Sequence, residues 1–428
     1  MQNTPSPELQ QVGTTQQTQT GALIALTSLF FMWGFVTVLN DIVSPHLQTI
    51  FSLNYRQASL VQVAFFFAYF IFSIPAAKLI DMTSYKTSIV VGLLTMGVGA
   101  FLFIPAASAA SYALFLVALM VLAGGITVLQ VAANPYVAVL GPPKTASSRL
   151  NLTQAFNSLG TTIGPWIGGI FILTTAKSAD ELNALSAQAL HAYKVEQASS
   201  VKTPYIFIGL LLVALAVIVY FLHLPAIPGT QKTSGSSGSI WKYRHLLLGV
   251  VGIFVYVGAE VAIGTFLIKY FHLHEIGDLP EVQGAKLVSY YWGGAMVGRF
   301  IGSWILQKVK AGTLLGIAAL AATTLVLVSM STTGQVAMGS IILVGFFNSI
   351  MFPSIFTLGI AELGPLTGEG SGLLIMAIVG GAVIPFLFGT LADVPSVGLH
   401  HAFILPLVCY LYIAYYGFKG SQPQQVTS

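Results

Sequence analysis

Charged residues are scarce in this sequence. Only 7% of its 428 residues are Asp, Glu, Lys or Arg, whereas 55% are hydrophobic. A typical soluble domain carries roughly 25% charged residues, and so few charges would not cover the surface of a soluble chain of this length. A lipid bilayer removes that requirement, because it solvates an apolar exterior. The composition therefore argues against soluble enzymes, DNA-binding proteins and disordered scaffolds, and predicts a polytopic membrane protein.

Other absences narrow the function further. The single cysteine, Cys409, lies in an apolar run, so no internal disulfide is possible and we expect a packed thiol. No stretch combines clustered Lys and Arg with aromatic residues, which argues against a nucleic-acid partner. The first 21 residues contain no Lys or Arg. Because a signal peptide needs a basic start, residues 1–21 are interpreted as a disordered cytoplasmic tail.

Long apolar runs are abundant. A membrane-crossing helix needs about 20 mostly apolar residues, and runs of this kind predict an all-α protein with twelve crossings. Their approximate spans are 22–46, 53–80, 87–107, 112–140, 149–173, 204–224, 246–271, 286–306, 312–331, 335–361, 370–391 and 398–418. The Lys and Arg distribution in the loops sets the orientation. With both termini in the cytoplasm, ten basic residues lie on the cytoplasmic side and six on the other, while Arg299 lies within a span.

A Gly/Ser-rich stretch divides the chain into two halves. Residues 226–241 are interpreted as a flexible cytoplasmic linker with six crossings on each side. The expected N-terminal half is 22–225 and the C-terminal half is 242–420, followed by a tail at 421–428.

The two halves also repeat each other. The spacing of Gln130 and Pro135 in the fourth span returns as Asn348 and Pro353 in the tenth, 218 residues later. The fifth and eleventh spans share a Pro and a Gly at matching positions, 220 residues apart. Two matches at nearly one offset favour a parallel repeat. Six plus six helices related by an axis along the membrane normal describe the major facilitator fold, with two pseudo-symmetric halves.

Three charged residues lie well inside predicted spans, where a charge costs at least ~2.5–3.5 kcal/mol and usually marks an ion or substrate path. Asp41, beside Asn40, is expected to bind a proton or a sodium ion; the alternative is a solvated carboxylate at the membrane interface. The repeat offset places Asp41 next to the position of Glu260. Glu260 either faces the same cavity or pairs with Arg299 as a structural bridge. Arg299 lies among small residues and is expected to have a structural or gating role.

Amide side chains form a second polar group within the spans. They are Gln130 and Asn134 in the fourth, Gln154 and Asn157 in the fifth, and Asn348 in the tenth. Spacings of four and three place each of the first two pairs on one helix face. Amides both donate and accept hydrogen bonds, which suits sugar hydroxyls; the alternative for each is an inter-helix hydrogen bond. Trp33, two turns before Asp41, and Phe352, four residues after Asn348, add the aromatic faces that a pyranose ring needs.

Several long strings are similar to one family. FFMWGFVTVLNDI, LQVAANPYVAVLG, SRLNLTQAFNSLGTTIGP, YYWGGAMVGRFIGS and FFNSIMFPSIFTLGI resemble the fucose–proton symporter family of the major facilitator superfamily, and most closely its bacterial glucose/galactose branch. The resemblance extends over nearly the whole chain except the tails and the linker. It implies a secondary active transporter that imports glucose and galactose with a cation, H⁺ or Na⁺, by alternating access. It further implies a monomer in the bacterial cytoplasmic (inner) membrane.

The resemblance also assigns residues. Asp41 matches the family's essential first-helix carboxylate and is the possible sodium ligand. Gln130 stands where fucose transporters have a second carboxylate, so a two-carboxylate proton relay is broken. Gln154 and Asn157 match sugar ligands, and Phe352 replaces a Tyr.

Three alternatives remain open: fucose as the sugar, N-acetylglucosamine as the sugar, or a passive hexose facilitator. The sequence has no HExxH, GxSxG or GxxxxGK[ST] motif, so neither an enzyme nor a cofactor is expected.

Overall fold

The computed structural model describes residues 18–51, 55–109, 111–172, 202–222 and 239–423, with a few isolated positions between 185 and 224. The side chains of residues 39–59 and 165–172 are outside this description. Most of the expected N-terminal tail and of the linker, and much of the C-terminal tail, also lie outside it.

Helices account for all twelve predicted crossings. The first six are α1 (Thr20–Phe51), α2 (Tyr55–Met82), α3 (Tyr85–Ser108), α4 (Tyr112–Val139), α5 (Ala146–Ile172) and α8 (Lys202–Phe221). The next three are α9 (Arg244–Phe271), α10 (Glu281–Ile305) and α11 (Ala311–Ser331). Each of the last three consists of two helices, α12 (Gly334–Asn348) with α13 (Met351–Gly359), α14 (Thr367–Met376) with α15 (Gly380–Ala392), and α16 (Gly398–His401) with α17 (Ile404–Tyr415).

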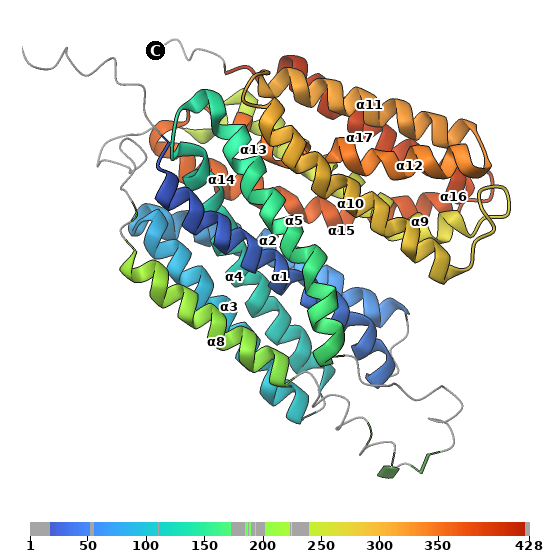
Figure 1. Cartoon of the computed structure of the whole chain (residues 1–428), viewed down its shortest axis with the longest axis horizontal. Helices are drawn as coiled ribbons and strands as arrows, with labels where there is room; N and C mark the ends of the chain where they lie inside the picture. The colour runs from blue at the N-terminus through green and yellow to red at the C-terminus, as the bar shows by residue number, and fades with distance from the viewer. Residues whose placement is uncertain are drawn as a thin grey trace, which may run out of the picture.

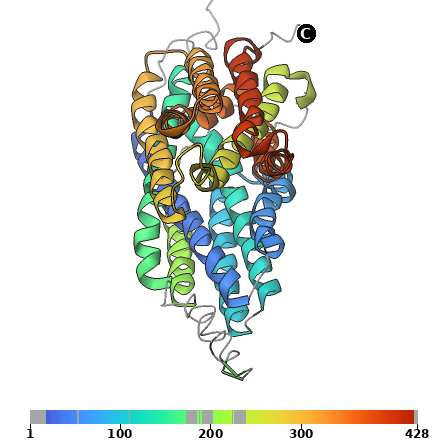
Figure 2. The same ribbon diagram turned by 90° about the vertical axis from the view of Figure 1, so that its right-hand side faces the viewer.

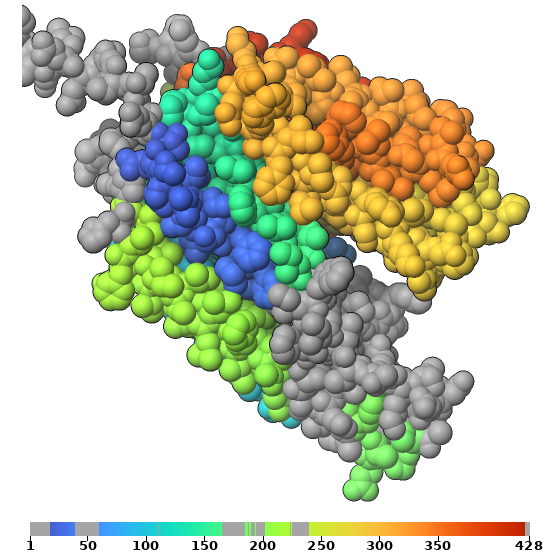
Figure 3. Space-filling model, viewed as in Figure 1, coloured from blue at the N-terminus to red at the C-terminus, as the bar shows by residue number. Residues whose placement is uncertain are grey.

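Ten of these crossings, within the described residues, are long and apolar enough on their own to span a membrane. The other two are α5 and α10, which carry more polar and small residues. These two helices pack against each other across the junction between the halves (Figure 3). Up to Gly164, α5 is largely buried, whereas α10 also exposes apolar side chains such as Trp292, Phe300 and Trp304.

The two six-helix halves meet at one end of the molecule (Figures 1 and 2). In Figure 1 this end is at the upper left, where α1 begins and where the last helix of the chain ends; we call it the closed end. The contacts between the halves run from α5 to α10 and α13, from α2 to α14 and α15, and from α4 to α14. Away from the closed end α5 and α10 diverge, toward what we call the open end.

Hydrogen bonds join the halves near the closed end. The hydroxyls of Ser147 and Thr357 lie 2.5 Å apart, and Ser148 Oγ donates to the carbonyl of Ser303 over 2.6 Å. These bonds connect the first turn of α5 with the last turns of α13 and α10. These polar contacts therefore hold the halves together at the closed end, and a separation of the halves would break them.

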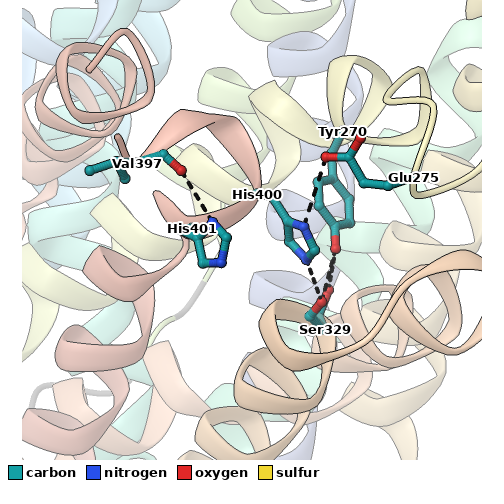
Figure 4. Close-up of polar contacts among 6 residues, drawn as sticks. All are labelled: Tyr270, Glu275, Ser329, Val397, His400 and His401. Atoms are coloured by element: carbon teal, nitrogen blue, oxygen red, sulfur yellow. Dashed lines mark hydrogen bonds and ion pairs between the residues drawn. The ribbon is translucent and has the colours of Figure 1, made fainter. Parts of the chain in front are cut away.

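A polar cluster stabilises the open end of the second half (Figure 4). The Tyr270 hydroxyl of α9 lies 2.9 Å from Ser329 Oγ of α11, and His400 Nε2 of α16 donates to the Ser329 carbonyl over 3.0 Å. His400 Nδ1 faces Glu275 Oε1 at 4.0 Å, while His401 Nδ1 contacts the Val397 carbonyl within its own segment. Three crossings of this half are thus tied together where their ends meet.

Candidate functional site

A cavity of about 130 Å³ lies between the two halves. Its lining residues are Trp33, Gln130, Gln154 and Asn157 from the first half and Tyr256, Glu260, Arg299, Phe352 and Pro353 from the second. Seven of these nine residues were selected from the sequence because they are polar or aromatic within apolar spans. The structure therefore brings residues from six different crossings into one site.

Two amides of the first half are fixed by hydrogen bonds in the cavity wall. Gln130 Nε2 donates to the Tyr69 hydroxyl of α2 over 2.7 Å, and Asn157 Nδ2 donates to the Phe30 carbonyl of α1 over 2.9 Å. One N–H of each amide is therefore occupied by the wall. The carbonyl oxygen of each amide points away from its nitrogen, so we expect it to be the atom that accepts from a ligand hydroxyl.

Close packing of α1 and α5 makes the Asn157 contact possible. A Cβ atom at Gly34 would lie only 2.1 Å from the backbone oxygen of Asn157, so this position requires glycine. The neighbouring Trp33 is 8% exposed and packs edge-on against Phe30, with ring centroids 5.3 Å apart. Trp33 and Asn157 are therefore presented to the cavity by a rigid helix pair.

The second half contributes the charged wall. Tyr256 Oη donates to Glu260 Oε1 over 2.8 Å and also lies 3.0 Å from the Asn348 carbonyl. Arg299 donates to Ser158 Oγ of the first half, and its Nε donates to the Ser349 carbonyl over 3.4 Å. Among the ion pairs of the described residues, none joins Glu260 to Arg299. The cavity therefore holds a carboxylate that no cationic side chain neutralises by direct contact.

Arg299 also connects the halves. Its backbone carbonyl accepts from Asn151 Nδ2 over 2.7 Å, and its guanidinium reaches Ser158 on the same helix, α5. Both contacts would change if α5 and α10 moved apart, and the structural or gating role expected for Arg299 stays a prediction.

Two of the expected residues whose side chains the structure describes are not among the lining residues. Asn348 is fully buried behind the wall, where its Nδ2 donates to the Tyr291 hydroxyl over 2.8 Å. Asn134 is also fully buried, and neither its Nδ2 nor its Oδ1 has a hydrogen-bond partner. Its shared face with Gln130 is real, but the cavity ends before reaching it. Asn40 and Asp41 lie within α1, and their side chains are outside the described residues.

Three participating residues were not selected from the sequence. Tyr256 precedes Glu260 by one helical turn, so the four-residue spacing was an available signal. Pro353 had been noted only as a repeat marker. Tyr69, which holds Gln130, is 61 residues away from it, and no local pattern connects the two.

Two six-helix halves that enclose one polar cavity, closed at one end, define a membrane transporter of the alternating-access type. The family model of the Major Facilitator Superfamily matches residues 22–386. The chain belongs to this superfamily and, within it, to the family that contains fucose–proton symporters and glucose/galactose transporters.

Curated relatives match this chain over almost its whole length. The glucose/galactose transporter of Brucella abortus biovar 1 is 50% identical over 403 residues, covering 94% of each chain. The putative glucose/galactose transporter of Helicobacter pylori is 42% identical over 407 residues, covering 94% of this chain and 98% of the relative. The L-fucose-proton symporter of Escherichia coli K12 is 36% identical over 409 residues, covering 93% and 92%.

Solved structures agree with these relatives. The crystal structure of the E. coli fucose:proton symporter FucP superimposes with a TM-score of 0.87 at 35% identity, over 94% of this chain and 98% of that one. A second structure of FucP, in the outward conformation, gives the same TM-score at 36% identity over the same shares. The predicted fold class, twelve helices in two halves, is confirmed, and the protein is a transporter rather than an enzyme.

Proposed function

We propose that this protein imports glucose and galactose together with a cation, by alternating access. The observation that carries the proposal is the lining of the cavity, in which three amides of the first half and three aromatic rings from both halves accompany one carboxylate, Glu260. The printed names of the relatives at 50% and 42% identity support these two hexoses.

The amides and rings suit a pyranose. Gln130, Gln154 and Asn157 present hydrogen-bonding groups to sugar hydroxyls, and amides cost less to desolvate than charges. Trp33 and Phe352 line the cavity from different halves, so the sugar can contact an apolar surface from each. A ligand bound to both halves would stabilise their closure around it, which is what alternating access requires.

Cation coupling is supported by the relative described as a fucose–proton symporter. We assign the cation to Asp41, with Asn40 as a neighbouring oxygen ligand, and Glu260 is the second carboxylate of the path. With Gln130 neutral, one titratable group of the first half remains. A single carboxylate among neutral oxygens suits sodium slightly better than a proton, and the coupling ion is one of these two.

The orientation belongs to the proposal as well. The loop charges support cytoplasmic termini, which places the closed end in the cytoplasm and the cavity toward the outside. This is an outward-facing arrangement, in agreement with the similarity to FucP in the outward conformation. We place the protein in the bacterial inner membrane as a monomer.

Uptake into energised vesicles tests the function. We expect labelled galactose to accumulate above its external concentration and accumulation to stop when the ion gradient is dissipated. Equilibration without accumulation would instead identify a passive facilitator. Counterflow with glucose, galactose, fucose and N-acetylglucosamine, at varied pH and sodium, ranks the sugars and identifies the ion; preference for either of the last two sugars would contradict the substrate assignment.

A further inference from the structure

One segment of α4 lies immediately beyond the cavity, toward the closed end. Pro135 has no N–H, so the carbonyl of Val131, four residues earlier, lacks its helical hydrogen bond. That carbonyl instead accepts from Ser371 Oγ of α14 over 2.8 Å, and both residues are fully buried. A backbone acceptor of the first half is therefore held by a side chain of the second half.

Asn134 lies next to this bond on the same helix. It follows Gln130 by four residues and Val131 by three. Around the helix its side chain therefore lies between that of Gln130, which lines the cavity, and that of Val131, whose carbonyl bonds to the second half. The side chain is 0% exposed, and neither Nδ2 nor Oδ1 has a partner. A buried amide without partners is costly, and native structures contain few of them.

We propose that Asn134 and the Val131 carbonyl form a second sugar-binding station, on the exit path, that becomes accessible when the halves separate at the closed end. Separation breaks the bond to Ser371, which frees the carbonyl to accept from a hydroxyl. It also exposes an amide that both donates and accepts. Hexose hydroxyls have this same dual character, so a sugar leaving Gln130 finds the next ligands one helical turn further along its path.

The station rests on the proposed sugar transport and adds a difference between the two ends of the protein in how Asn134 contributes to sugar affinity. In the conformation described, the sugar reaches only the cavity that Gln130 lines. Asn134 therefore contributes to sugar affinity measured from the closed end and not to affinity measured from the open end. Asn134 contacts one particular hydroxyl of the sugar. Its contribution to affinity is therefore absent for a sugar that lacks this hydroxyl.

The test uses Asn134→Leu, which has nearly the same volume, and Asn134→Ala as a second variant should the first fail to fold. Ser88→Ala is the matched control, because Ser88 also has a buried hydroxyl without a partner but lies on α3, which packs within the first half. Half-saturating concentrations for galactose exchange are measured in right-side-out and inside-out vesicles. The measurement is repeated with monodeoxy galactoses.

We expect Asn134→Leu to raise the half-saturating concentration at the closed end by about 2- to 13-fold, the loss of one net hydrogen bond. At the open end the half-saturating concentration should change less than twofold. For the one monodeoxy galactose that lacks the hydroxyl contacted by Asn134, the variant and the unmodified protein should have the same half-saturating concentration at the closed end. An equal loss for every sugar would mean that Asn134 only biases the conformational equilibrium, and would overturn the station. Unchanged values on both faces would overturn it too. If the unmodified protein shows no saturable exchange from either face, the proposed function fails instead.

Discussion

The hydroxyl of Tyr69 provides a direct test of how the cavity wall orients Gln130. Tyr69→Phe removes one oxygen atom and leaves the ring in its buried position, where Tyr69 is only 3% exposed. The lost contact is the 2.7 Å hydrogen bond from Gln130 Nε2. Because Gln130 lines the cavity, its amide can turn toward water after the change, so the smaller cost of about 0.5–1.5 kcal/mol applies. We therefore expect the Kd for galactose to rise about 2- to 13-fold.

Isothermal titration of the purified protein in detergent measures this change. Tyr412→Phe is the matched control, since it removes a 2.9 Å hydrogen bond to the Leu248 carbonyl in the second half and leaves the cavity intact. The reasoning also requires that Tyr69 acts through Gln130. In a Gln130→Ala background, Tyr69→Phe should therefore have almost no further effect, a coupling that a double-mutant cycle detects. Additive losses in the double mutant would refute the assignment of Tyr69 as a positioning residue.

Three further predictions concern the site itself. Gln154→Ala should weaken galactose binding by about 0.5–1.5 kcal/mol without unfolding the protein; titration and thermal unfolding check this, and a Kd change below twofold would remove Gln154 from the site. Gln130→Glu should reduce glucose uptake and make it pH-dependent, because the new carboxyl titrates within the cavity; uptake that is unchanged at every pH would contradict this. Asp41→Asn should abolish accumulation in energised vesicles while counterflow survives, because the amide neither carries a proton nor supplies a charge. Continued accumulation would make Glu260 the coupling residue.

The sequence predicted the crossings and most of the cavity for a physical reason. In a membrane helix, apolar residues are the default, so each polar residue signals a cost that function or packing must offset. This signal selected Gln154, Asn157, Glu260 and Arg299, all of which line the cavity.

The same signal could not distinguish Gln130 from Asn134. Both lie on one face of α4, but only the three-dimensional packing decides where along the helix the cavity ends. Asn348 shows the related difficulty, since it is buried away from the cavity, where its Nδ2 donates to Tyr291 while its Oδ1 has no partner. The contact between Tyr69 and Gln130 depends on how α2 and α4 pack, which local spacing does not determine.

The polarity of α5 and α10 has a consequence for how these helices are held in the bilayer. Within the described residues, α5 and α10 are not among the helices that are long and apolar enough to span a membrane. α10 carries Glu281, Lys286 and Arg299, and each of these charges lowers the free energy gained on entering lipid. α5 packs against α1, which precedes it in the chain, and α10 packs against α9, which precedes it, and against α12, which follows it. We expect these neighbours to stabilise the two helices in the bilayer. The surface along which α5 and α10 meet therefore depends on the packing of each helix within its own half as well as on lipid.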